Sequence, residues 1–357
     1  MKSHIIALLI AVITCSSTDG RQFLDPQNGS QHHVYSDAFN ESKVNVTQDS
    51  RHQPEYYGYD RPCPNAEDIA PCVCTYNSED NAMDLDCSAV ESEDQLKQIF
   101  KADFQFKNYR SFIMYANINI KVLEAGVFNG ISFEQIVIQF SHLEIIELQA
   151  LDSCYETAWK IDVCYNRITS FPFDELSHFP KLRYFAIGYN SLSMIPADAF
   201  NGLTALETLY LWDNHANIVG TFKDLPNLSG INLGYNNFSL TNNTIPTKYI
   251  KTGSSDLSYI NLFGNNIVSV EPGAFDIVEG LVISMYGNAL STLEEATWRP
   301  YLEAQGYLSA EDNPLVCGCD IAWLFGEDQL LGQVYDDATC TDGERLIDLD
   351  PKIFDLC

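Results

Sequence analysis

Apolar residues recur at fixed offsets from a series of asparagines between residues 110 and 315. When the asparagine is placed at position 9 of each unit, positions 4 and 6 are apolar. The asparagines, spaced by 24, 24, 22, 29, 23 and 25 residues, are Asn166, Asn190, Asn214, Asn236, Asn265, Asn288 and Asn313. Because strand side chains alternate between faces, positions 4 and 6 would point inward and positions 3, 5, 7 and 8 outward. Each unit is therefore predicted to be a strand followed by a returning arc.

The apolar positions predict which residues form the core. The pairs at positions 4 and 6 are Ile161/Val163, Phe185/Ile187, Leu209/Leu211, Ile231/Leu233, Ile260/Leu262, Ile283/Met285 and Leu308/Ala310. Two earlier units fit less well: Ile136/Ile138 with Ser141 at position 9, and Ile113/Tyr115 with Ile118 at position 9. Position 19 is expected to close each arc with Phe128, Leu151, Leu176, Phe200, Phe275 and Trp298, and with Phe222 two residues early.

The asparagines at position 9 are interpreted as structural. Where a strand turns away inside a stack, backbone N–H and C=O groups would lose their partners, and a short amide side chain can pair with both kinds. The seven asparagines therefore predict a buried hydrogen-bond ladder. Replacing Asn190 with alanine is expected to destabilise the protein by roughly 1 to 3 kcal/mol.

The spacing of apolar residues and asparagine resembles the leucine-rich repeat signature, which has a period of 20 to 29 residues. The resemblance covers residues 110–315. It implies an α/β-type solenoid: a leucine-rich repeat horseshoe with a parallel concave β-sheet, an irregular convex side and disulfide-bonded N- and C-terminal caps.

The order of segments predicts a secreted protein. Residues 1–17 have a basic start and a short apolar run, which is typical of a signal peptide rather than a membrane span. Residues 18–61 are polar, contain no repeat and predict a disordered, glycosylated leader. A cysteine-rich N-terminal cap (62–109), repeats (110–304), and a last repeat with a cysteine-rich C-terminal cap (305–357) follow. No membrane anchor is expected, and the predicted location is extracellular.

Eight cysteines form two groups at the ends of the repeats. They are Cys63, Cys72, Cys74 and Cys87 in a C-x8-C-x-C-x12-C pattern, and Cys317, Cys319, Cys340 and Cys357 in a C-x-C-x20-C-x16-C pattern. Zinc is the rival interpretation, but secretion favours disulfides. A solenoid exposes its core at both ends, so caps are needed there. Resemblance to extracellular leucine-rich repeat proteins implies the pairs Cys317–Cys340 and Cys319–Cys357.

Two more cysteines lie inside the repeats. Cys154 falls at position 22, which is normally inward, and Cys164 falls at position 7, which is normally outward. A regular strand between them would separate the two residues by more than the roughly 4.4 to 6.8 Å that a disulfide allows between Cα atoms. Either a bridge in an irregular repeat or two free thiols fits the sequence.

Charge and chemistry exclude several classes of function. The formal net charge of −29 disfavours nucleic acid, because a phosphate backbone requires a basic surface. The histidines have neither metal-ligand spacing nor the context of a catalytic nucleophile, and His32 and His33 lie in the leader. We therefore expect no catalytic residue, no metal and no cofactor.

The chain carries several N-x-S/T sequons, which predict surface glycosylation in a secreted protein. They are Asn28, Asn40, Asn45, Asn227, Asn237 and Asn242. The unit between Asn236 and Asn265 has no aromatic residue at position 19 and contains Pro246 and Gly253. Its extra length predicts a protruding loop.

The outward positions 3, 5, 7 and 8 are rich in aromatic residues and poor in charge. The candidate binding residues are Tyr165, Tyr184, Tyr189, Tyr210, Trp212, Tyr235, Tyr259, Phe263, Tyr286 and Tyr307. Such a face is typical of an interaction surface, with Trp212 and Tyr235 as central anchors and shallow pockets at glycines 188, 234, 264 and 287. The alternative is that the rings only pack across the sheet.

A narrower resemblance comes from the N-terminal cap. The stretches RPCPNAEDIAPCVCTY and MDLDCSAVESEDQLKQIF, followed by tyrosine-rich repeats, resemble the family of the non-catalytic subunit of decapod shrimp (Oplophorus) luciferase. The resemblance covers about residues 62–357 and implies a secreted, non-catalytic, protein-binding role beside a small catalytic subunit that oxidises an imidazopyrazinone. The alternatives are a soluble immune-recognition or adhesion protein and a matrix protein.

Overall fold

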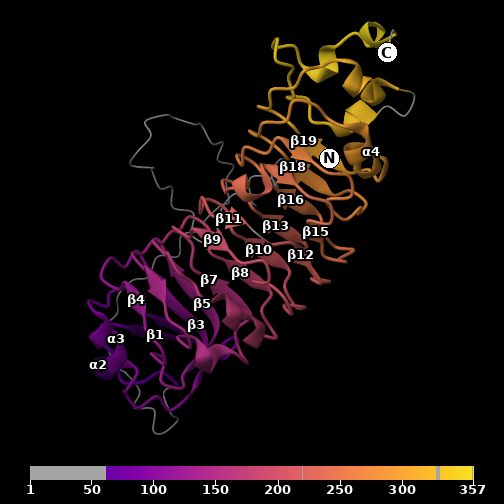
Figure 1. Cartoon of the computed structure of the whole chain (residues 1–357). Helices are drawn as coiled ribbons and strands as arrows, with labels where there is room; N and C mark the ends of the chain where they lie inside the picture. The colour runs from indigo at the N-terminus through magenta and orange to yellow at the C-terminus, as the bar shows by residue number, and fades with distance from the viewer. Residues whose placement is uncertain (1–61, 219, 327–329, 356) are drawn as a thin grey trace, which may run out of the picture. The chain divides into compact units, whose positions relative to one another are not determined.

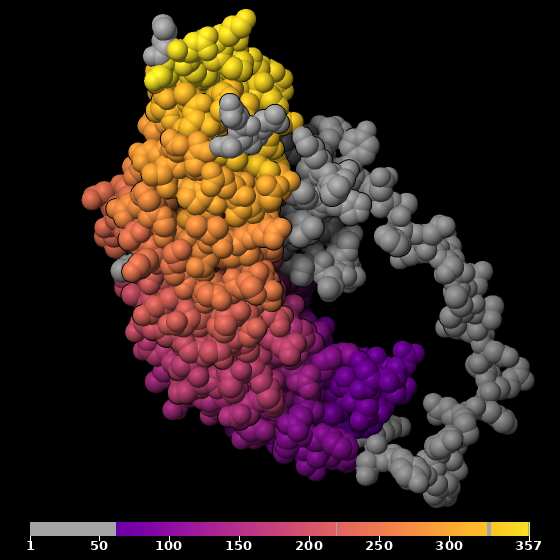
Figure 2. All heavy atoms as spheres, turned by 90° about the vertical axis from the view of Figure 1, so that its right-hand side faces the viewer, coloured from indigo at the N-terminus to yellow at the C-terminus, as the bar shows by residue number. Residues whose placement is uncertain are grey.

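A computed structural model describes residues 62–218, 220–326, 330–355 and 357, which belong to one compact unit, Pro62–Cys357. The predicted signal peptide and leader, sequons Asn28, Asn40 and Asn45, and histidines 32 and 33 lie outside the described residues. Figure 1 shows the unit as a solenoid of stacked strands, and in Figure 2 the colours follow one another from indigo to yellow, so consecutive repeats lie side by side.

One sheet of eleven strands runs through all repeats. The strands are β1 (Val73–Asn77), β2 (Ala82–Asp86), β3 (Asn108–Tyr115), β5 (Ser132–Gln139), β7 (Lys160–Asp162), β8 (Tyr184–Ala186), β10 (Thr208–Tyr210), β13 (Gly230–Asn232), β16 (Tyr259–Asn261), β18 (Val282–Ser284) and β19 (Tyr307–Ser309). They lie in this order across the sheet, and only the hairpin β1–β2 is antiparallel. Position 4 pairs with position 4 of the next repeat, as for Ile161 and Phe185.

The returning arcs form short parallel pairs and single turns. The short strands are β4 (Val122–Leu123), β6 (Ile145–Ile146), β9 (Met194–Ile195), β11 (Asn217–Ile218), β12 (Phe222–Lys223), β14 (Thr244–Ile245), β15 (Ile250–Lys251) and β17 (Ser269–Val270). The 3-10 turns are η1 (Asp152–Cys154), η2 (Phe173–His178), η3 (Ser239–Thr241), η4 (Cys319–Phe325), η5 (Leu330–Gln333), η6 (Leu346–Asp348) and η7 (Pro351–Phe354). The described α-helices are α2 (Ala66–Ile69), α3 (Glu93–Ile99) and α4 (Glu295–Glu303). None of these helices is long and apolar enough to span a bilayer.

The core lies between the main sheet and the arcs. All the residues predicted at positions 4 and 6 from Ile136 onward are buried, as are the large residues at position 19. The first repeat corrects the prediction by one residue. Phe112 and Met114 point inward, whereas Ile118 is 61% exposed. Asn117, not Ile118, therefore holds position 9. The interrupted apolar pattern of this repeat does not by itself fix the register.

The position-9 asparagines form a ladder of hydrogen bonds through the core. In a representative rung, Asn265 Nδ2 donates to Leu233 O (3.1 Å) and Leu262 O (2.8 Å), and its Oδ1 accepts from Asn236 N (2.6 Å). Equivalent bonds occur at Asn166, Asn190, Asn214, Asn236, Asn288 and Asn313. Each amide thus joins two neighbouring repeats where the strand ends.

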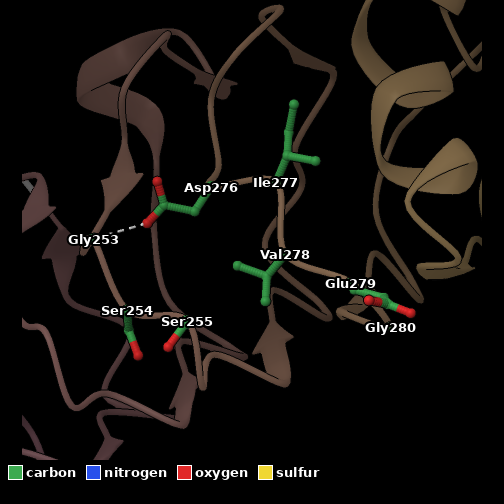
Figure 3. A pocket seen from close by; sticks show the side chains of 8 residues that line it. All are labelled: Gly253, Ser254, Ser255, Asp276, Ile277, Val278, Glu279 and Gly280. Atoms are coloured by element: carbon green, nitrogen blue, oxygen red, sulfur yellow. Dashed lines mark hydrogen bonds between the residues drawn. The ribbon is translucent and has the colours of Figure 1, made fainter.

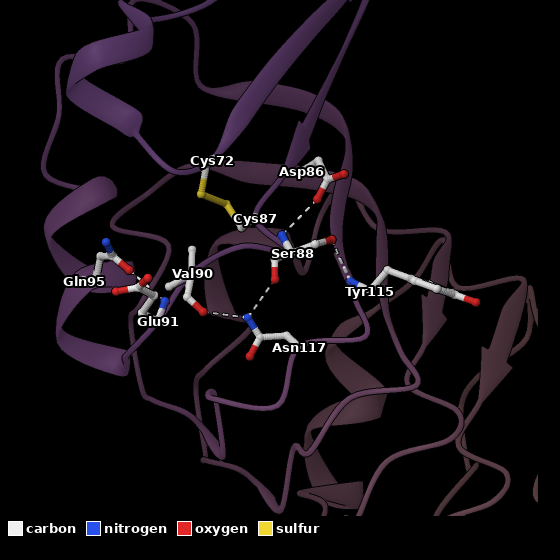
Figure 4. The surroundings of a disulfide bond; sticks show 9 residues. All are labelled: Cys72, Asp86, Cys87, Ser88, Val90, Glu91, Gln95, Tyr115 and Asn117. Carbon is white, nitrogen blue, oxygen red and sulfur yellow. Dashed lines mark hydrogen bonds between the residues drawn. A yellow bond between two sulfur atoms is a disulfide. The ribbon is translucent and has the colours of Figure 1, made fainter. Parts of the chain in front are cut away.

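The ladder begins inside the N-terminal cap. Asn117 donates to Ser88 O (3.0 Å) and Val90 O (2.7 Å), next to the disulfide Cys72–Cys87 (Figure 4). This bond links the two ends of the β1–β2 hairpin, and Cys63–Cys74 links β1 to the start of the cap. At the other end, the disulfides are Cys317–Cys340 and Cys319–Cys357, the pairs that the resemblance implies.

The remaining repeat cysteines are not bridged to each other. Cys154 is a free thiol, fully buried in the core, and burial raises its pKa to about 11. Cys164 is buried as well, after the end of β7. Neither alternative holds: Cys154 is a free thiol and therefore does not bridge Cys164, and Cys164 is disulfide-bonded and therefore is not a second free thiol.

The long repeat folds back onto the core instead of protruding. Phe238 and Tyr249 are 1% and 2% exposed, and Tyr249 packs at 5.7 Å against Phe222 of the preceding arc. Tyr249 therefore supplies the ring that position 19 lacks. β14 and β15 pair with the arcs on either side, so the extra residues lengthen the arc without leaving the stack.

Candidate binding surface

The residue before each ladder position has a left-handed backbone. The φ angle at position 8 lies between 50° and 66° in all nine repeats. We call these residues the position-8 strip: Ala116, Phe140, Tyr165, Tyr189, Asp213, Tyr235, Gly264, Gly287 and Asp312. A bulky side chain in this conformation costs on the order of 1 to 3 kcal/mol, which glycine avoids. The strip nevertheless contains four large aromatic residues.

Rings of four successive repeats stack into what we call the N-terminal column: Tyr115, Phe140, Tyr165 and Tyr189. Phe140 and Tyr165 are nearly parallel, with centroids 4.4 Å apart, and Tyr165 and Tyr189 are 4.8 Å apart. These contacts offset part of the backbone strain. Because the ring faces cover one another, the accessible part of the column consists mainly of ring edges.

Glycines of the face accommodate rings of neighbouring repeats. A Cβ at Gly188 would lie 2.5 Å from Trp212 Cδ1, and one at Gly234 would lie 2.2 Å from Phe263 Cε1. At Gly264 a Cβ would lie 2.6 Å from Tyr235 Cδ1. The predicted pockets at these three glycines are therefore wrong, because neighbouring rings already fill them. Phe263 also contacts Tyr235 edge to face at 4.4 Å.

The ten predicted aromatic residues differ in accessibility. Trp212 and Tyr259 are buried, at 9% and 8% exposure, whereas Tyr189, Tyr235 and Tyr286 are 46%, 44% and 36% exposed. The other five are half-buried: Tyr165, Tyr184, Tyr210, Phe263 and Tyr307. The accessible rings lie at positions 7 and 8, where the strands end. Trp212 is therefore a support for its neighbours, and Tyr235 is the accessible member of the predicted anchor pair.

The sequence pattern missed three aromatic residues that belong to this face. Phe140 lies at position 8 of a repeat with serine in place of the ladder asparagine, and Tyr115 lies in the repeat whose alignment was shifted. Tyr335 of the C-terminal cap packs at 6.1 Å against Tyr307. Phe140 is at an outward position in the predicted repeat numbering, and Tyr115 becomes outward in the corrected numbering, but the cap offers no periodic signal.

Charged groups on the face are few and mostly acidic. Lys160 Nζ lies 3.8 Å from Asp162 Oδ2 and over the Tyr184 ring, 4.8 Å from its centroid. Burial raises the pKa of Asp162 above its usual range, although Lys160 opposes this shift. Burial also raises the pKa of Asp213, and His215 lies 3.6 Å from its carboxylate. Burial and the nearby Asp337 carboxyl raise the pKa of Glu311 to about 7.

A separate open depression lies outside the aromatic face (Figure 3). It has a volume of about 890 Å³ and is lined by residues 253–255 and 276–280, which precede β16 and β18. Asp276 Oδ2 accepts from Gly253 N (3.0 Å), so this carboxylate already closes the loop. The depression holds none of the predicted binding residues.

The sequons in the described residues differ in exposure. Asn227 and Asn242 are exposed, whereas Asn237 is half-buried. Their glycosylation stays a prediction.

The histidines in the described residues have no arrangement that suggests catalysis. His142 Nε2 contacts Arg167 Nη2 at 3.0 Å. In the part of the chain that the structure describes, no cluster of three or more histidine, cysteine or acidic side chains could hold a metal.

The sequence matches known proteins along most of its length. The Leucine rich repeat family model matches residues 159–215. The Oplophorus-luciferin 2-monooxygenase non-catalytic subunit of Oplophorus gracilirostris is 32% identical over 318 residues, which cover 82% of this chain and 87% of the relative.

The chain is also similar to solved structures. A crystal structure of the TLR13–ssRNA13 complex matches with a TM-score of 0.51 and 22% identity, over 64% of this chain and 31% of that chain. The FLRT2 repeats in a complex with Latrophilin 3 and Unc5D match with a TM-score of 0.49 and 21% identity, over 66% of this chain and 69% of that chain. The similarity to TLR13 shows the leucine-rich repeat fold, and the ligand has to be argued from the face.

Proposed function

The chain belongs to the leucine-rich repeat family of the Oplophorus-luciferin 2-monooxygenase non-catalytic subunit, and we therefore propose that it is a secreted, non-catalytic protein that binds a protein partner. The partner contacts the concave face and is a small catalytic subunit that the repeat protein stabilises. The accessible tyrosines of the face carry this assignment, because they are large side chains with few charged neighbours and a partner can cover them.

The size of the face supports a protein ligand. Nine consecutive parallel strands, at about 4.8 Å each, give a face roughly 40 Å long. A stable interface covers about 800 Å² on each partner, which such a face can supply. Tyr189, Tyr235 and Tyr286 are spread along this length and each is at least 36% exposed.

Stacking gives the face a second property that favours binding. Rings that already pack against neighbours, such as Tyr189 on Tyr165 and Tyr235 on Phe263, have little side-chain freedom left to lose. Binding then costs less conformational entropy, since the contact residues are held before the partner arrives. Tyrosine also offers a hydroxyl beside its apolar ring, which suits the centre of an interface.

The test is isolation of the oxidised protein from its native fluid without reducing agent, followed by size and mass measurement. We expect a defined protein partner in fixed ratio. The isolated partner is then titrated with Tyr189→Gly, Tyr235→Gly and the control Ile277→Ser, which removes an exposed apolar side chain from the depression. Weaker binding by the tyrosine variants alone is expected. A monomer without partner, or equal loss in the control, would reject the assignment.

A further inference from the structure

We propose that the part of the position-8 strip from Tyr189 to Asp312, together with Tyr286 at the neighbouring position 7, docks a proline-rich segment with basic residues in the polyproline II conformation. This inference rests on the proposed function, because it names the part of the partner that the face recognises. It is built from the backbone conformation of the strip, the spacing of the accessible rings on and beside it, and its two carboxylates, Asp213 and Asp312.

The left-handed backbone of the strip is strained wherever it carries a large side chain in place of glycine. Position 8 is left-handed in every repeat, and glycine occupies it at Gly264 and Gly287 without strain. Tyr235 occupies the same conformation with a large side chain that is 44% exposed. Its ring lies over Gly264, where a Cβ would be 2.6 Å from Tyr235 Cδ1, and packs edge to face on Phe263 at 4.4 Å. These contacts hold the ring in place, and the 44% of Tyr235 that stays exposed is the part that a ligand can contact.

The spacing of the accessible rings matches one kind of extended chain. Tyr189, Tyr235 and Tyr286 follow β8, β13 and β18, which are separated by one intervening strand in each case. Two strand spacings are about 9.6 Å. One turn of polyproline II rises about 9.3 Å over three residues, so every third residue would meet a tyrosine. A β-strand repeats each face at about 6.6 Å and falls out of step.

Hydrogen bonding and charge restrict the kind of peptide that the strip can bind. Polyproline II has no internal hydrogen bonds, so its carbonyls can accept from tyrosine hydroxyls, whereas the carbonyls of a helix are already used. Among the described residues, His215 is the ion-pair partner of Asp213, whereas Asp312 interacts with the Tyr286 hydroxyl and has no ion pair with a basic side chain. These carboxylates lie beside the accessible tyrosines and complement arginine or lysine between the prolines. The chain's net charge of −29 also favours a positively charged ligand.

Labelled synthetic peptides test the inference by fluorescence anisotropy on the oxidised full chain. The probe is RPPRPPRPPR, and the controls are EPPEPPEPPE, with opposite charge, and RGSRGSRGSR, with equal charge but no polyproline preference. We expect the probe to bind at least about tenfold more tightly than both controls, as in other aromatic grooves that select preformed polyproline II. Tyr235→Gly should weaken the probe about tenfold, whereas Ile277→Ser should leave it unchanged.

Glycine is the substitution of choice because it removes the Tyr235 side chain and keeps the left-handed backbone. An unchanged melting temperature for Tyr235→Gly, with lost peptide binding, would establish a ligand contact. Equal binding of the probe and RGSRGSRGSR, no binding of the probe, or binding of a chitin oligosaccharide lost in Tyr235→Gly would overturn the inference. If the native partner still depends on Tyr235 in these cases, the proposed function stands and only the proline-rich ligand fails.

Discussion

Positions 8 and 9 of each repeat are neighbours in the chain but follow opposite rules. Position 9 is asparagine in all but one of the nine repeats, and its amide is used by the backbones of two repeats. Position 8 changes among aromatic, acidic, alanine and glycine residues, although its backbone angle stays the same. Hydrogen-bond geometry therefore fixes the residue at position 9, whereas position 8 has a fixed backbone angle and a variable side chain.

The largest expected effect is at the ladder. Asn236 Nδ2 donates to Leu211 O (3.0 Å) and Leu233 O (3.1 Å), and its Oδ1 accepts from Ala216 N (3.2 Å). Asn236→Ala leaves these buried groups without partners and should lower the free energy of unfolding by about 2 to 3 kcal/mol in denaturant titration. Tyr235→Gly, one residue earlier, is the matched variant and should change it by less than about 1 kcal/mol. Equal losses would remove the distinction between the two positions.

A smaller effect is expected where a ring covers a glycine. Gly234→Ala would place a Cβ 2.2 Å from Phe263 Cε1, so the ring has to move. We expect a loss of about 1 to 2 kcal/mol, in the range of overpacked cores, measured by thermal unfolding. Gly230→Ala on the same strand is the control, because its Cβ meets nothing within 4 Å. A loss as large in the control would show that strand flexibility, not ring packing, is responsible.

The core and ladder could be predicted from the sequence because each obeys a period. Ile161 and Val163 recur at fixed offsets from Asn166, and the caps follow from cysteine spacing. Ile113 and Tyr115 were placed inward wrongly, because Phe112, Ile113 and Met114 are all apolar and the pattern alone could not choose the register. The register of β3 is fixed by its pairing with the neighbouring strands β2 and β5.

The accessible part of the face could be predicted only in outline. Outward positions identified the tyrosines, but not that Trp212 would lie on Gly188, or that Tyr189 would stack on Tyr165. These contacts join residues of different repeats, so no local pattern contains them. The left-handed angle at Tyr235 was also absent from the prediction, because its cause is the exit of the strand into the ladder turn and not the residue itself.

The smallest expected effect lies where the strip meets the C-terminal cap. Burial, the Asp337 carboxyl and the charge of Asp312 raise the pKa of Glu311 from its usual 4.5 to about 7. Between these two values the folded chain holds a proton that the unfolded chain releases, so stability falls as pH rises through this window. Glu311→Gln removes this titration. Its melting temperature should exceed that of the parent by roughly 1 to 3 °C at about pH 8, with a smaller difference near pH 5. Parallel pH profiles would mean that Glu311 ionises normally and that the acidic end of the strip carries its full charge at neutral pH.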